Sequence, residues 1–205
     1  MSGKVSMGRT TAAVEGDVVV LLIGMRINHF WAVHHWLPVM LSMFRMLGEL
    51  KKDRGKGMRG HVLLTGSPRT YYVVQYWESK EKLYSYASSP EMFHHRVWKY
   101  INGKERAGRV PGHVGLWHES YISPEGSHES IYAYMPPFGL AAATGVLPVE
   151  ERGRRAKDRF EHRAAQKTEQ AQKTEQSPEP EQVPKPEQVP KADAGADADA
   201  GAPQP

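Results

Sequence analysis

The chain has 205 residues, of which 40% are hydrophobic, and a formal net charge of +4. That length suits one domain of ordinary size. There is no cysteine, which excludes disulfide bonds, zinc–thiolate sites and a cysteine nucleophile. The surplus of basic residues is scattered, apart from a cluster over 51–59 that is typical of a solvated loop after a helix, so we expect no nucleic-acid partner.

The two ends of the chain differ in composition from its middle. Residues 1–13 have no apolar central region and resemble no signal peptide, and we expect them to be disordered. Residues 164–205 contain AQKTEQ twice, PEQVPK twice and no aromatic side chain, so they cannot bury enough apolar surface to offset the entropy of ordering. We therefore predict a folded domain over 14–148, a charged helical linker over 149–163 and a disordered, low-complexity repeat tail over 164–205.

The longest apolar stretch, 18–50, is interrupted by Arg26, Asn28, Pro38 and Arg45. These interruptions favour a strand followed by a helix over a membrane-spanning segment. We predict no membrane span and a cytoplasmic location.

The sequence of the first half of the domain predicts three strands and one helix. A continuous apolar run over 18–25 is typical of a central strand that is buried on both faces. The next helix should begin near Trp36, because Pro38 is tolerated only in a first helical turn. Strands are predicted over 60–65 and 70–77, joined by a hairpin turn.

The second half predicts two helices and two further strands. Ser79 is a plausible N-cap of a short helix that ends near Ala87. A second helix should open at Ser89-Pro90-Glu91 and end near residue 102, followed by strands over 113–122 and 129–134. The order β-α-β-β-α-β is the ferredoxin-like pattern. We therefore predict an α+β fold whose antiparallel sheet carries helices on one face.

The strand predicted over 70–77 has large side chains on both faces. They are Tyr71, Val73 and Trp77 on one face, and Tyr72, Val74 and Tyr76 on the other. An antiparallel sheet covered on one side only would present polar residues on the second side. A second copy of the same sheet is the simplest cover, so we predict a sheet-to-sheet homodimer.

The segment VVQYWESKEKLYSYASSPEMFHH, over 73–95, and the β-α-β-β-α-β order resemble the dimeric α+β barrel superfamily, which includes the antibiotic-biosynthesis monooxygenases. More narrowly, ESIYAYMPPFGLAAATG, over 129–145, is similar to a fungal and bacterial subfamily of monooxygenase-like proteins associated with a terpenoid–polyketide pathway. The resemblance covers about residues 17–148.

This resemblance implies a ligand cavity between the sheet and its helices in each protomer. It also implies a monooxygenase that acts with molecular oxygen, without flavin or metal, on a small aromatic or terpenoid/polyketide-like molecule. In such relatives a tryptophan at the end of the third strand lies beside the substrate, and Trp77 matches that position. Other relatives bind haem through a helix histidine or have no known reaction. The alternatives are therefore a haem-binding protein and a non-enzymatic dimer that binds a small ligand.

His94 is the candidate base among ten histidines, none of which forms an HExxH spacing or another set of metal ligands. It precedes Trp98 by one turn on the predicted helix, so it would enter an apolar cavity lined by Trp77 and Trp98. A neutral imidazole there would act as general base toward a phenolic substrate or as axial ligand of haem iron. The alternative is a partly buried histidine that is bonded to a backbone carbonyl.

Polar residues at the end of the first strand complete the predicted catalytic set. Arg26 would hold a carboxylate or enolate and Asn28 would donate to a developing oxyanion; the alternative for both is ordinary strand-end polarity, since such residues are mostly exposed. Glu119 is expected to pair with an arginine. The candidates for substrate binding are His29, Tyr76, Trp98, Trp117 and Glu119.

Overall fold

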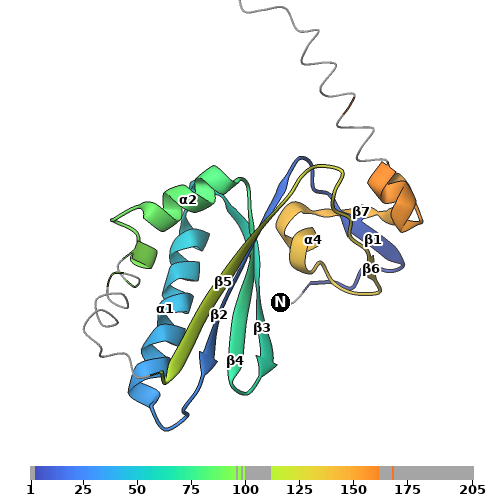
Figure 1. Cartoon of the computed structure of the whole chain (residues 1–205). Coiled ribbons are helices and arrows are strands. Elements are labelled where there is room, and N and C mark those ends of the chain that lie inside the picture. The colour runs from blue at the N-terminus through green and yellow to red at the C-terminus, as the bar shows by residue number, and fades with distance from the viewer. Residues whose placement is uncertain (1–2, 96, 98, 100–111, 162–167, 169–205) are drawn as a thin grey trace, which may run out of the picture.

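The computed structural model describes residues 3–95, 97, 99, 112–161 and 168. A four-stranded antiparallel sheet forms the centre of this part of the chain, with helices against one face and a small second sheet against part of the other (Figure 1). Apart from Thr168, the predicted tail over 164–205 lies outside the described residues, and so does Trp98.

The central sheet consists of β2 (Val18–Ile27), β3 (Met58–Ser67), β4 (Thr70–Trp77) and β5 (Val114–Ser123). Its spatial order is β3-β4-β2-β5, and all three neighbouring pairs are antiparallel. The β2–β4 register pairs Val19 with Trp77 and Ile23 with Val73. Both predicted faces of β4 are therefore confirmed, and so is the α+β, ferredoxin-like fold.

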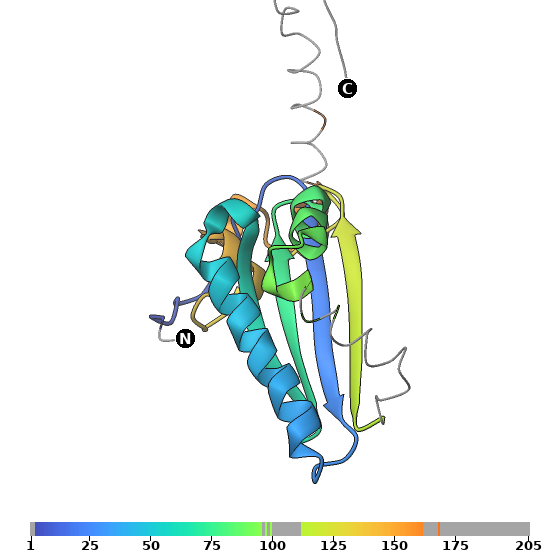
Figure 2. The same ribbon diagram turned by 90° about the vertical axis from the view of Figure 1, so that its left-hand side faces the viewer.

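Helices α1 (Val33–Lys52) and α2 (Lys80–Ser88) lie on the same face of this sheet (Figure 2). The α1 helix begins three residues before the predicted start, and Pro38 lies inside it. The backbone N–H of Trp36 already donates to the carbonyl of Ala32, so the proline removes one later bond without setting the helix start. Ser79 caps α2 as predicted, since its hydroxyl accepts a hydrogen bond from the backbone N–H of Lys82 at 3.2 Å.

The segment after α2 differs from the prediction. Ser89-Pro90-Glu91 does not open a helix: the backbone N–H of Met92 donates to the carbonyl of Ser89 in a turn, and helical structure begins at Phe93. Proline at a first helical position is a preference, and here the local turn prevails. The predicted end of this helix, near residue 102, lies outside the described residues.

A small three-stranded sheet of order β6-β1-β7 packs near the N-terminal half of β2. It contains β1 (Arg9–Ala12), β6 (Tyr132–Ala133) and β7 (Val146–Pro148). The expected disorder of residues 1–13 is thus wrong for β1. The strand predicted over 129–134 is reduced to β6, which belongs to this second sheet.

Polar contacts explain why β1 is ordered. The Thr11 hydroxyl donates to the carbonyl of Ser130 at 2.7 Å, and the backbone N–H of Ala12 donates to the Ser130 hydroxyl at 3.0 Å. Thr11 and Ala12 are both buried. A short segment with few large apolar residues therefore gains its order from pairing far along the chain, which its own composition does not reveal.

Two hydrophobic clusters lie on opposite faces of the central sheet. The first packs α1 and α2 onto the sheet around Trp77, Leu47 and Leu83. The second joins Val18 of the sheet to Ala12 and Ala141, and α4 (Gly139–Thr144) packs on β3. The chain thus covers part of its own second face, a cover that the sequence-based homodimer prediction had assigned entirely to a second copy.

The charged segment predicted as a linker over 149–163 contacts the domain. After the 3₁₀ turn Val149–Glu151, residues 156–161 are helical. The Arg159 guanidinium is buried, where its Nε donates to Glu129 at 2.8 Å and its NH1 donates to the carbonyls of Gly153 and Arg154. None of the helices in the described part of the chain combines the length and hydropathy that a membrane crossing requires.

Candidate active site

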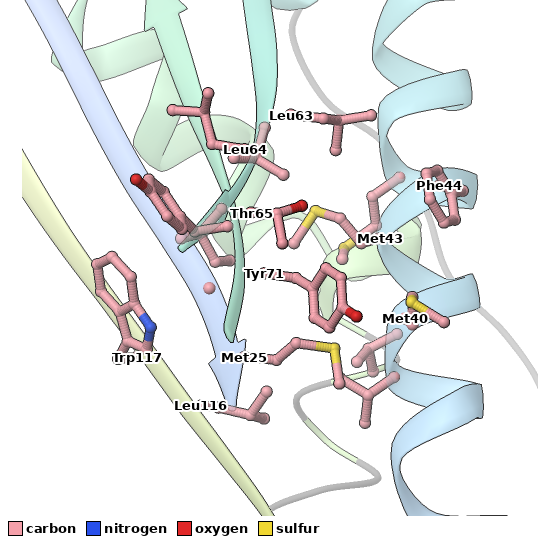
Figure 3. A pocket seen from close by; sticks show the side chains of 17 residues that line it. Met25, Met40, Met43, Phe44, Leu63, Leu64, Thr65, Tyr71, Leu116 and Trp117 are labelled. Carbon is pink, nitrogen blue, oxygen red and sulfur yellow. The ribbon is translucent and has the colours of Figure 1, made fainter. Parts of the chain in front are cut away.

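Two cavities lie between the central sheet and its helices. The histidine cavity has a volume of about 340 Å³, and its polar and aromatic lining includes Gln75, Trp77, Tyr86, His94, His118 and Ser120. The methionine cavity has a volume of about 220 Å³, and its lining includes Met25, Met40, Met43, Met46, Phe44 and Tyr71 (Figure 3). The cavity that the sequence predicted beside Trp77 is therefore present.

Trp77 forms a rigid wall of the histidine cavity. Its side chain is 1% exposed, and its indole N–H donates to the side-chain oxygen of Gln75 at 3.0 Å. The Tyr86 ring lies 5.7 Å from it, centroid to centroid, at a tilt of 38°. Because Gln75 satisfies the indole N–H, Trp77 offers a ligand an aromatic surface and no hydrogen-bond donor.

His94 reaches the same cavity from the helical turn after α2. Its Nδ1 lies 3.2 Å from the carbonyl of Ala87, which favours the tautomer with the proton on Nδ1 and the lone pair on Nε2. Burial lowers the pKa of His94, and the neighbouring His118 and His95 lower it further, whereas the bond to Ala87 raises it. The imidazole is therefore neutral near pH 7 and basic at Nε2.

A carboxylate that the sequence did not indicate anchors this turn. Glu49 of α1 accepts hydrogen bonds from the Tyr86 hydroxyl at 3.4 Å and from the backbone N–H of Phe93 at 3.3 Å. Lys56 lies 3.7 Å from the same carboxylate. Burial, followed by the charge of Glu49, raises the pKa of Tyr86, so the hydroxyl stays protonated. A weak signal was available, because an acidic residue in the last turns of a helix opposes the helix dipole.

The predicted anion-binding residues lie elsewhere. Trp77 pairs with Val19 at the start of β2, whereas Arg26 pairs with Thr70 near its other end, seven residues or about 23 Å further along the strand. The Asn28 side chain donates to the carbonyl of Gly112 at 2.8 Å, and so holds a loop. Arg26 and Asn28 therefore do not join His94, because strand-end polarity has placed them at the opposite end of the sheet.

His29 belongs to an exposed aromatic group at that opposite end. Its Nδ1 lies 2.9 Å from Nδ1 of His113, and both rings contact Trp31. Among the described residues, no group of three or more histidine or acidic side chains is placed to hold a metal ion. Because this aromatic group lies at the far end of the sheet from His94, His29 cannot touch a ligand that is bound beside His94.

Three predicted substrate-binding residues have their side chains on the second face of the sheet. Tyr76 packs against the cluster around α4, Trp117 covers Gly24, and the Glu119 carboxylate accepts a hydrogen bond from the Tyr121 hydroxyl at 2.7 Å. Trp117 is on the rim of the methionine cavity, but its ring lies on the far side of β2 from α1 (Figure 3). The expected arginine partner of Glu119 is wrong, since a tyrosine two residues away on the same strand face fills that role.

The sheet order and the helices on one face define an α+β protein with a ferredoxin-like fold (Figure 2). The chain belongs to the Monooxygenase af470-like family, whose sequence profile matches residues 18–140. Monooxygenase af470 of Aspergillus fumigatus is 28% identical over 154 residues, an alignment that covers 65% of this chain and 53% of that protein. The chain thus spans about half the length of that relative.

Two solved structures resemble the fold. A crystal structure of aldoxime dehydratase (OxdRE) in complex with butyraldoxime aligns with 69% of this chain and 38% of its own, at a TM-score of 0.52 and 15% identity. A second aldoxime dehydratase structure aligns at a TM-score of 0.49 and 17% identity, with 69% of this chain and 39% of its own covered. At these identities the first likeness supports the fold alone.

Proposed function

We propose that the protein is a monooxygenase that oxidises a small aromatic or terpenoid/polyketide-like molecule with molecular oxygen, without flavin or metal, in the histidine cavity. Membership of a monooxygenase-like family supports the reaction type. The observation that carries the proposal is the pairing of a neutral, oriented His94 with the buried ring of Trp77 in one cavity. Arg26 and Asn28 have no part in it.

Without a cofactor, the substrate itself must supply the electrons that reduce oxygen. Nε2 of His94 takes the proton of a phenol or enol hydroxyl, and the resulting anion is electron-rich enough to react with O₂ at its activated CH₂ carbon. The peroxide formed on that carbon takes back the proton held by His94. The O–O bond then breaks as the carbon loses its remaining hydrogen as a proton, so one oxygen atom stays as a carbonyl and the other leaves as water with both protons. Trp77, as part of the cavity wall, positions the ring of the substrate.

Oxygen uptake tests the proposal. An anthrone-type substrate, which carries an activated CH₂ group beside an enolisable carbonyl, should be consumed with one O₂ per molecule. His94→Ala should slow this turnover by about 10²–10⁴-fold, the usual contribution of a general base. His34→Ala, an exposed histidine of α1, is the matched control and should keep the wild-type rate. Tight binding of the substrate without any oxygen uptake would instead favour a non-enzymatic ligand-binding protein.

A haem-binding protein is the second candidate. The bond between Nδ1 of His94 and the Ala87 carbonyl is the support that metal-bound histidines usually have, and it leaves the lone pair on Nε2. However, the described residues that line the two cavities include no lysine or arginine to pair with the haem propionates. The lining thus fits an axial ligand but not the rest of the group, and the cofactor-free reaction ranks first. A Soret band that His94→Ala removes would reverse this order.

We also propose that the protein is a homodimer joined through the second face of its sheet. The small sheet and α4 pack around Val18 and Tyr76, at one end of that face. At the other end Tyr72 and Trp117 form an aromatic pair with ring centroids 6.0 Å apart. An apolar surface of this kind is usually covered. The cytoplasmic location stays a prediction.

A further inference from the structure

The two cavities are neighbouring parts of one groove. Ile23 of β2 and Met46 of α1 line both of them. On the helix-facing side of β2, Leu21 lines the histidine cavity and Met25 lines the methionine cavity. These two residues are four positions apart on the strand, so the groove extends over about 13 Å.

The two parts differ sharply in chemistry. The histidine cavity presents hydrogen-bonding groups of His94, Gln75 and Ser120. The methionine cavity presents thioethers and hydrocarbon, and the hydroxyl of Tyr71, on its wall, donates to the carbonyl of Pro68 at 3.0 Å. Water finds few partners in such a space, whereas flexible methionine side chains adapt to hydrocarbon ligands of varied shape.

Each of the two cavities has an exposed aromatic side chain in its lining. Tyr84 of α2 lines the histidine cavity and is 59% exposed, and Phe44 of α1 lines the methionine cavity and is 51% exposed. A ligand can therefore be longer than either cavity. The shared residues at the junction are an isoleucine and a methionine, which are apolar, so a hydrocarbon chain passes them without losing hydrogen bonds.

We propose that the ligand of this protein is an amphiphile, with a phenol or enol head at His94 and a hydrocarbon tail that passes Ile23 and Met46 into the methionine cavity. The identity of the head group rests on the proposed function, in which His94 takes the proton of the substrate hydroxyl. The tail rests on the methionine cavity alone. Binding and oxygen consumption can therefore be measured separately.

Binding of 4-alkylphenols of increasing chain length, followed by isothermal titration calorimetry, tests the tail. Each methylene that enters the methionine cavity should lower Kd by roughly fourfold. Met40→Trp, which fills that cavity from α1, should end this gain after the first few carbons while phenol itself binds as before. Leu41→Trp adds the same ring at the adjacent, exposed position and should keep the wild-type dependence on chain length.

Alkylbenzenes of the same lengths test the head. The wild-type protein should prefer a 4-alkylphenol over the alkylbenzene by about threefold to tenfold, the worth of one hydrogen bond. His94→Ala should remove this preference and keep the dependence on chain length. The two substitutions thus separate head from tail, and each variant serves as the control for the other.

Some outcomes would overturn the amphiphile without touching the oxygenase. They are a Kd that does not change with chain length, and a chain-length dependence that is identical in Met40→Trp and Leu41→Trp. If Met40→Trp does not fold, as judged by circular dichroism, Met43→Phe offers a milder filling of the same cavity. Conversely, chain-length-dependent binding without oxygen uptake would sink the proposed function and leave the amphiphile standing.

Discussion

The two faces of the central sheet carry similar apolar and aromatic side chains but are covered in different ways. On the helix face, α1 and α2 contact the sheet around Trp77 and Leu47 and stand away from it over the two cavities. On the second face, α4 and the small sheet pack tightly around Val18 and Tyr76, and Ala143 lies close to Gly60. The wide spacing on one side leaves two cavities, and the close spacing on the other side gives a tightly packed interface.

The difference follows from side-chain size. Long methionines and aromatic rings on α1 and α2 hold these helices away from β2 and β4. Small residues, Gly60 on β3 and Ala141 and Ala143 on α4, let that helix approach the strands closely. A cavity therefore forms where large flexible residues meet, and a dry interface forms where small residues meet.

Truncation of Trp77 should have the largest effect on the helix face. Trp77→Ala removes a buried ring that contacts both helices through the core cluster, so the free energy of unfolding should fall by about 3–5 kcal/mol. Urea denaturation measures it. Trp31→Ala, at a position 69% exposed, should change it by less than about 0.5 kcal/mol. A loss of less than about 1 kcal/mol in the Trp77→Ala variant would mean that the indole ring contributes little to the packing of the helices on the sheet.

The close approach on the second face can be broken with one methyl group. A Cβ at Gly60 would lie 2.9 Å from Cβ and 3.1 Å from Cα of Ala143, so Gly60→Ala should force α4 away from β3 and cost about 1–3 kcal/mol. Gly48→Ala is the matched control: nothing lies within 4 Å of a Cβ there, inside α1, and the helix should gain about 0.5–1 kcal/mol. Thermal unfolding of the two variants should shift in opposite directions. A neutral Gly60→Ala would show that α4 packs loosely.

The end of the second face around Tyr72 and Trp117, which none of the described elements covers, tests the homodimer. Tyr72→Glu places a charge beside Trp117, and burying that charge in a sheet-to-sheet interface should weaken dimerisation by at least about tenfold. Analytical ultracentrifugation at several concentrations measures this. Tyr84→Glu introduces the same charge on exposed α2 and should leave the dimer intact. A wild-type protein that sediments as a monomer at all concentrations would contradict the proposal directly.

The sequence predicted the central sheet well because its signals are local. The run of aromatic and β-branched residues in β4, the Ser79 cap and the turn before Thr70 each depend on a few neighbouring residues. The β1 strand and the cover by α4 could not be predicted, because their order comes from contacts with residues far along the chain, such as Thr11 with Ser130 and Gly60 with Ala143. Local composition carries no trace of such pairing.

The site was predicted in part for the same reason. Trp77 and His94 are separated along the chain only by α2 and one turn, and this short connection keeps both beside one cavity. Arg26 and Asn28 were assigned anion-binding roles from their side-chain chemistry, since no distance between them and His94 could be read from the sequence. The antiparallel register places them at the opposite end of β2 from Trp77. Glu49, which anchors the turn before His94, was missed because its partners lie on two other elements.

The smallest expected effect is the dependence of stability on the protonation of His94, which lines the histidine cavity. Burial lowers the pKa of His94 below its value of about 6.5 in the unfolded chain, so the unfolded state binds more protons as pH falls. Stability should therefore decrease from about pH 6.5 downwards, by at most about 1.4 kcal/mol per pH unit for this group. His94→Gln should flatten the decrease, as measured by urea denaturation at pH 5–8. His61→Gln is the comparison on β3, since burial and Lys51 lower the pKa of His61 too and its removal should act in the same direction. An unchanged slope in His94→Gln, with a changed one in His61→Gln, would mean that His94 is solvated in the folded protein and cannot serve as a desolvated base.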